Sequence, residues 1–195
     1  GEPVSLDGWI QVASPSGPES YQASLAYGNG EIDGTIVFEG FPLRRAGTFP
    51  VQGSLGGSAR VAGNAEALSV AGDVRLQEGT LNRDPISVSG SFRVGPELIA
   101  VENLRGTYLA HRIRSGSGSY VPATGKLAAQ AHYDGLVANQ QISVDMRLDA
   151  NLPDPRQNPT LEAVLATRFS GVVEASAIEV DGETAPPWKV VIRQD

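Results

Sequence analysis

Side chains able to carry acid–base or metal chemistry are few in this sequence and lie far apart. The two histidines are His111 and His132. Each neighbours an arginine or a tyrosine in a stretch with strand periodicity, and neither has an Asp, Glu or His partner at a metal-ligand spacing. Cysteine is absent, which excludes disulfides and thiolate zinc sites and leaves the cellular compartment open. We therefore expect both histidines to be surface or hydrogen-bonded strand residues, with no catalytic role.

The short motifs that could support catalysis are also missing. No G-x-S-x-G nucleophile elbow occurs, and no helix that could bind an anion is expected after the Gly/Ser stretch 115–119. The glycines of 28–34 are more typical of a hairpin turn at Asn29-Gly30 than of a phosphate-binding loop. The carboxylates show no spacing that would pair them for hydrolysis. We predict that the chain is not an enzyme and uses neither a metal nor a cofactor.

Charge and composition exclude further classes of function. The chain has 15 basic and 22 acidic residues, a net charge of −7, which argues against nucleic acid as a partner and against adhesion to an anionic bilayer. No run approaches the roughly 18 consecutive apolar residues of a membrane helix. The first residues, GEPVSLDG, lack a basic stretch followed by an apolar one and so do not resemble a signal peptide. We expect a mature protein or an excised fragment.

The polar and apolar residues alternate in short runs between turn signals, as in an all-β meander. Turn pairs stand at Asp7-Gly8, Asn29-Gly30, Asp33-Gly34, Asp134-Gly135 and Asp181-Gly182. Nothing marks a linker, so residues 1–195 are predicted to form a single segment. Strands are predicted near 8–13, 21–27, 31–39, 54–62, 67–77, 85–94, 98–113, 116–121, 126–134, 141–150, 166–180 and 187–193.

One stretch departs from this pattern. Residues 151–159 hold three prolines without periodicity and are predicted to form a loop. The following residues fit a short helix near 159–166, with Asn158 as N-cap and Pro159 at the first helical position. A continuing strand fits them as well.

Glycine recurs at the centre of the apolar face of several predicted strands. The stretches LSVAGDVRL (68–76) and ISVSGSFRV (86–94) share this pattern, and similar patterns surround Gly34, Gly57, Gly106 and Gly171. Glycine inside a strand marks a bulge, a bend or a close backbone approach. If the glycines stack across neighbouring strands, they form a crease along which the sheet curls into an open trough with an apolar inner wall. The alternative is that each glycine relieves local crowding in a two-sheet sandwich.

The side chains that would line such a trough follow from the alternation. Two neighbouring strands would contribute Leu68, Val70, Val74, Leu76, Ile86, Val88, Phe92 and Val94. A downstream strand would contribute Ile142, Val144, Met146 and Leu148. The residues between them are mostly Ser, Asp and Arg and would face water.

Residues 63–120 resemble the repeating units of the AsmA-like superfamily, and most closely those of its TamB branch. The resemblance lies in G-x₄-L-x₃-G-x-V-x-L-x₂-G-x-L, then a polar turn and I-x-V-x-G-x-F-x-V, then LIAVENLRGTY and a closing GSGSY. Residues 165–194 are similar to a further such unit that ends in a strand led by Trp188. Together the two stretches cover about half of the chain.

The resemblance implies a β-taco, an elongated and mostly antiparallel sheet folded lengthwise. It also implies a segment of a periplasmic protein anchored in the inner membrane of a diderm bacterium. Such a protein shields phospholipid acyl chains between the inner and outer membranes. Its implied partners are phospholipid, adjacent repeats of the same chain, and an outer-membrane barrel protein whose assembly it assists.

Two other functions fit the same alternation of residues. A closed-core β-sandwich would serve as a structural or adhesive module, with its function in the surface loops. A chaperone-like module would offer a sheet edge or a groove to the strands of other proteins.

Overall fold

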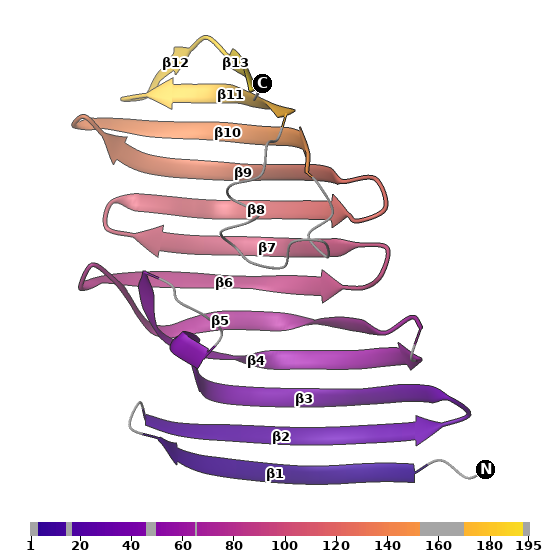
Figure 1. Ribbon diagram of the computed structural model, residues 1–195. Coiled ribbons are helices and arrows are strands. Elements are labelled where there is room, and N and C mark those ends of the chain that lie inside the picture. Colours follow the sequence, from indigo (N-terminus) through magenta and orange to yellow (C-terminus); the bar gives the residue numbers. More distant parts are fainter. Residues whose placement is uncertain (1–3, 15–16, 46–49, 65, 153–169, 193–195) are drawn as a thin grey trace. The chain divides into compact units, whose positions relative to one another are not determined.

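The fold is all-β. The computed structural model describes residues 4–14, 17–45, 50–64, 66–152 and 170–192. These residues form one antiparallel sheet in which the strands are neighbours in chain order, except that β13 pairs with β11 (Figure 1). The sheet is not closed. The predicted all-β class and the open antiparallel sheet are confirmed.

The chain forms two compact units. Unit 1 comprises residues 1–96 and 106–109, and unit 2 comprises residues 97–105 and 110–195. The long strands of unit 1 are β1 (Val4–Ser14), β2 (Gly17–Gly28), β3 (Glu31–Pro42), β4 (Val51–Asn64), β5 (Ser69–Leu81) and β6 (Asp84–Val94), and a short 3-10 helix spans Leu43–Arg45. Unit 2 contains β8 (His111–Val121), β9 (Lys126–Val137), β10 (Gln140–Asn151), β11 (Ser170–Val180), β12 (Glu183–Ala185) and β13 (Trp188–Ile192). Residues of β7 (Ile99–Tyr108) belong to both units.

Two of the predicted turns are confirmed. Asn29-Gly30 joins β2 to β3 with φ of 53° and 83°, and Asp181-Gly182 joins β11 to β12 with φ of 51° and 84°. Two successive positive φ values define the type I′ turn, whose twist matches that of the strands on either side. The residue pair Asn-Gly or Asp-Gly tolerates this conformation, which is why the sequence signal works here.

The other three Asp-Gly pairs were expected in turns and lie inside strands instead. Asp7-Gly8, Asp33-Gly34 and Asp134-Gly135 belong to β1, β3 and β9. Asp33 accepts two hydrogen bonds from Arg60, both of 3.0 Å, and Asp134 pairs with Arg114. Partners on other strands thus hold Asp33 and Asp134 in the sheet, where the local turn preference does not decide the structure.

A boundary between two strands was also predicted wrongly. The predicted strand 98–113 is broken by a turn at Leu109-Ala110, and the expected gap at 114–115 lies inside β8. Leu109 adopts a φ of 52°, but leucine is not a typical turn residue, so the sequence gives no turn signal at this position. At Arg114 the pairing of β8 with β9 shifts by one residue, so a β-bulge lies where a gap between two strands was predicted.

Two predicted elements, a short helix and a loop, lie wholly or mostly outside the described residues. The predicted helix near 159–166, with Asn158 and Pro159, lies outside the described residues, as does most of the predicted loop 151–159. The part of the chain that is described includes no helix long and apolar enough to cross a bilayer.

Candidate apolar binding face

The predicted lining residues of β10 lie on one face of unit 2. The registers place Ile142, Val144, Met146 and Leu148 on the same face as their antiparallel partners on β9 and β11. Cross-strand partners in a sheet point the same way, so the register defines a continuous face across the unit. We call this set the unit 2 apolar face: Ile113, Tyr120, Leu127, Ala129, Ala131, Tyr133, Ile142, Val144, Met146, Leu148, Ala150, Val173, Ala175, Ile178, Val180, Ala185, Trp188, Val190 and Ile192.

The centre of the unit 2 apolar face is buried and its margin is open. Val144, Ala175 and Ile178 form a cluster with exposed fractions of 8%, 1% and 7%. Met146 and Tyr133 pack against this cluster. On β13, by contrast, Trp188 and Val190 are each 48% exposed. The face therefore grades from a small packed centre to an exposed apolar margin.

Unit 1 carries an apolar face of its own. Val70, Val74 and Leu76 on β5 share it with Phe92 and Val94 on β6, because Val70 pairs with Val94 and Gly72 with Phe92. The alternation of β6 adds two further predicted residues to the face, Ile86 and the exposed Val88. Leu68, the remaining predicted lining residue of this face, directly precedes β5 and is exposed.

We call this second set the unit 1 apolar face. It extends across β1 to β4 through the printed registers. Besides the residues of β5 and β6 it comprises Val4, Leu6, Gly8, Ile10, Tyr21, Ala23, Leu25, Tyr27, Ile32, Gly34, Ile36, Phe38, Phe41, Leu55, Gly57, Ala59 and Val61.

The glycines of unit 1 do not stack on one another. Gly34 lies opposite Leu25, Gly57 opposite Phe38, and Gly72 opposite Phe92. The expected single crease of aligned glycines is therefore wrong in this unit. Each of these glycines thus has a large cross-strand partner on one neighbouring strand, beside which a second large side chain would compete for space.

A second constraint, close approach of the neighbouring backbone, keeps all three positions small; at Gly34 a Cβ atom would lie 2.5 Å from the Ser24 carbonyl oxygen. A Cβ atom built on Gly57 would collide with the carbonyl oxygen of Asp73, and one built on Gly72 would collide with that of Ser58. The neighbouring backbone thus approaches these glycines closely, as expected for glycine in a strand. A Cβ atom built on Gly171 would make milder contacts, 2.9 Å from both the Ala150 Cβ and the Asp149 carbonyl oxygen.

The opposite face of unit 1 is polar and carries ion pairs between strands. Arg60 contacts Asp33 through both carboxylate oxygens, and Arg75 contacts Glu39 at 2.6 Å. The hydrogen bonds from Arg60 hold the pKa of the Asp33 carboxyl below its usual value. The predicted division into an apolar and a water-facing polar side is thus present in this unit.

The polar face of unit 2 contains a network around His132. Its Nδ1 lies 2.7 Å from Asp145 Oδ1, and its Nε2 lies 3.4 Å from both Asp134 Oδ1 and Ser143 Oγ. Burial raises the pKa of Asp134, but hydrogen bonds from Ser143 and Arg114 outweigh burial, so this pKa lies below its usual value. Spacing in the sequence did not reveal the network, because its members meet only through the antiparallel register.

His111 has a different environment. Its Nδ1 is 2.5 Å from the hydroxyl of Tyr133, and the two rings stack with centroids 6.0 Å apart. Both histidines are thus hydrogen-bonded strand residues, as expected. Within the described part of the chain, no group of three or more His, Cys, Asp or Glu side chains is placed to hold a metal ion.

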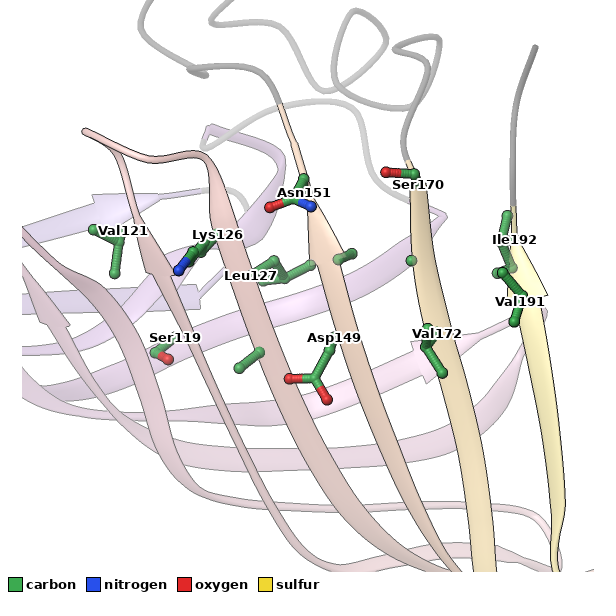
Figure 2. A pocket seen from close by; sticks show the side chains of 13 residues that line it. Ser119, Val121, Lys126, Leu127, Asp149, Asn151, Ser170, Val172, Val191 and Ile192 are labelled. Carbon is green, nitrogen blue, oxygen red and sulfur yellow. The ribbon is translucent and has the colours of Figure 1, made fainter.

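A depression that the sequence did not predict lies where the strands of unit 2 end (Figure 2). It has a volume of about 650 Å³, and β8 to β11 and β13 all contribute to it. Polar side chains such as Lys126, Asn151 and Ser170 line it together with Val172 and Val191. The two valines are cross-strand partners on the mostly polar face, where Val121 and Ala128 also line the depression, so the alternation of polar and apolar residues is interrupted here.

Comparisons with protein-family models, with curated proteins and with solved structures find no match for this chain. The resemblance to the AsmA-like superfamily therefore stays a prediction from the motifs of residues 63–120 and 165–194.

Proposed function

We propose that this chain is a periplasmic segment of an inner-membrane-anchored protein of a diderm bacterium, and that its apolar faces shield phospholipid acyl chains in transit between the two membranes. The observation that carries the proposal is the incomplete burial of these faces. Among the described residues only six hydrophobic residues are buried, and three of them are alanines. The largest fully buried side chains in that part of the chain are Glu19 and Pro42.

A closed sandwich would distribute burial differently. Its core would enclose large aliphatic side chains almost completely. Here Val88 and Val94 are 39% and 43% exposed, although both belong to the unit 1 apolar face. This exposure favours a surface that an apolar ligand can contact.

The energetics of the ligand fit such a surface. Moving an acyl chain into water costs about 0.8 kcal/mol for each methylene, or roughly 12 kcal/mol for a chain of about sixteen carbons. Aliphatic side chains offset this cost without directional bonds, so a lipid can slide along them. The resemblance to AsmA-like units supports the same role, with adjacent repeats and an outer-membrane barrel protein as the partners.

Crosslinking tests the proposal directly. A photo-crosslinking amino acid at Val88 should capture phospholipid in cells, identified by mass spectrometry of the adduct. The same amino acid at Ser89 is the matched control, because this neighbour on β6 points to the polar face. Equal lipid capture at both positions, or none at either, would refute the proposal. Adducts to barrel proteins alone would favour a chaperone role instead.

A further inference from the structure

One end of the unit 1 apolar face carries a charged side chain. Glu19 on β2 lies two residues before Tyr21, so the two side chains point to the same side of the strand, which is the side of the unit 1 apolar face. The Glu19 side chain is 0% exposed. Proteins rarely bury a carboxylate completely unless it has a partner of opposite charge. The contacts of Glu19 therefore distinguish this end of the face from the rest.

The partner of Glu19 comes from the short 3-10 helix that follows β3. Arg45 Nη1 lies 2.6 Å from Glu19 Oε2, and the Tyr21 hydroxyl donates a hydrogen bond of 2.7 Å to the same oxygen. Burial and this hydrogen bond raise the pKa of the Tyr21 hydroxyl, so it remains a donor. Glu19 therefore holds Arg45 at the end of the face where β2 begins and β3 ends (Figure 1).

The guanidinium of Arg45 is able to bind a second anion. The Arg45 side chain is 46% exposed, although the carboxylate that it contacts is completely buried. A guanidinium has five N–H donors in a planar fork, so the contact through Nη1 leaves other donors for a second acceptor. This fork matches two oxygens of one phosphate group. Arg44, the preceding residue of the 3-10 helix, is exposed and adds a second positive charge.

The opposite end of the unit 1 apolar face would repel a phosphate. At that end β3 begins with Glu31, and the connection between β4 and β5 includes Glu66; both side chains are exposed. Among the described residues from 28 to 32 and from 63 to 68, none is basic. The charges at the two ends therefore favour one orientation of an anionic amphiphile on this face.

Between its two ends the face is long enough for one acyl chain. The apolar side of β2 carries Tyr21, Ala23, Leu25 and Tyr27 in succession. At about 3.4 Å per residue, the strand covers roughly 20 Å from Tyr21 to Tyr27. One acyl chain spans about half of the bilayer hydrocarbon core of roughly 30 Å, or about 15 Å. A lipid whose phosphate lies at Arg45 therefore has room for its acyl chain along the strands.

We propose that Arg45, positioned by Glu19, binds the phosphate of a phospholipid headgroup, so that the lipid lies on the unit 1 apolar face with its head at the 3-10 helix. This inference rests on the proposed function and adds the orientation of the lipid and a residue that recognises its head. Arg44 strengthens the attraction of the phosphate to this end of the face. The site requires a phosphate that is attached to acyl chains, because the guanidinium and the apolar side chains bind different parts of one molecule.

Calorimetric titration of the complete chain with two lipids, each below its micelle-forming concentration, tests the proposal. Dioctanoyl phosphatidylglycerol carries a phosphate, and dioctanoylglycerol has the same acyl chains without it. We expect the phospholipid to bind about tenfold more tightly, as one charge-assisted bidentate contact permits. The variant Glu19→Gln/Arg45→Gln removes both charges, and in it the two affinities should become equal through weaker binding of the phospholipid. Inorganic phosphate should not displace the phospholipid from the unaltered chain.

Asp33→Asn/Arg60→Gln is the matched control, because it removes an ion pair of the same type from the polar face of unit 1. It should keep the tenfold preference, and hydrogen exchange of β2 and β3 shows whether each variant remains folded. In the unaltered chain, the Nε–Hε NMR signal of Arg45 should shift with the phospholipid and stay in place with dioctanoylglycerol, which tests the contact without a substitution.

Several results would overturn this orientation of the lipid. These are equal affinities of the unaltered chain for the two lipids, an unchanged preference in Glu19→Gln/Arg45→Gln, a lost preference in the control, and an Arg45 signal that does not respond to the phospholipid. Displacement by inorganic phosphate would indicate a site for free phosphate instead. Failure of both lipids to bind would refute the proposed function itself, so the two failures are distinguishable.

Discussion

The close approach of β4 to Gly72 gives the sharpest prediction about stability. A Cβ at Gly72 would collide with the Ser58 carbonyl oxygen and lie 2.7 Å from the Ala59 Cα. Both atoms belong to backbone, so a rotamer change cannot relieve the contact. Overpacking of this kind costs about 1–3 kcal/mol, and the lower chain entropy of alanine offsets about 0.5–1 kcal/mol of it. The two ranges leave a net cost of about 0–2.5 kcal/mol, and since both contacts are with backbone we expect Gly72→Ala to lower the free energy of unfolding of unit 1 by about 1–2 kcal/mol.

Gly8→Ala is the matched control. Gly8 and Gly72 belong to the same row of cross-strand partners, which runs from Gly8 through Ala23, Ile36 and Ala59. Because a Cβ at Gly8 meets no atom within 4 Å, this variant should be neutral or more stable by about 0.5 kcal/mol.

Urea unfolding measures the difference. Pulsed hydrogen exchange of the amides of β4 and β5, both in unit 1, follows the unfolding of that unit at each urea concentration. With a slope of about 1–3 kcal/mol per molar urea, the midpoints of the two glycine variants should differ by roughly 1 M. Equal midpoints would show that the backbone does not crowd Gly72, and the account of these glycines would be wrong.

Three further predictions concern an ion pair on the polar face of unit 1, the packed centre of unit 2, and a bulge residue of β11. Arg60 lowers the pKa of Asp33 in the folded chain. The stability that results is present above the pKa of the unfolded carboxyl and is lost as pH falls through the folded pKa. Arg60→Gln should therefore raise the Asp33 pKa in an NMR titration and reduce the loss of folding stability at acid pH. Ala175→Leu, at 1% exposure, should cost about 1–3 kcal/mol in thermal unfolding, whereas Leu at the exposed Ala128 should be neutral. Ala177 has a φ of 49°, so Ala177→Gly should leave stability unchanged or raise it by up to about 1 kcal/mol.

The two-sided character of the strands could be predicted from the sequence. Ile142, Val144, Met146 and Leu148 alternate with polar residues, and a strand has a side-chain period of two, so their shared face requires no knowledge of the partner strand. Division of the lining residues between β5, β6 and β10 followed from the same rule.

What depends on pairing between strands could not be predicted. The partners of Gly57 and Gly72, and the network around His132, follow from the register, which the alternation of a single strand does not fix. Bulges at Arg114 and near Ala177 shift this register by one residue without a distinctive residue type to mark them.

The meander of each unit has a consequence for how such a chain can change in length. Every strand from β1 to β6 has its sequence neighbours as its pairing partners. Removing a hairpin of two strands would leave the flanking strands antiparallel, with their apolar residues still on the same side. Insertion of a hairpin would have the same property. Evolution can therefore lengthen or shorten this architecture two strands at a time without reversing either face.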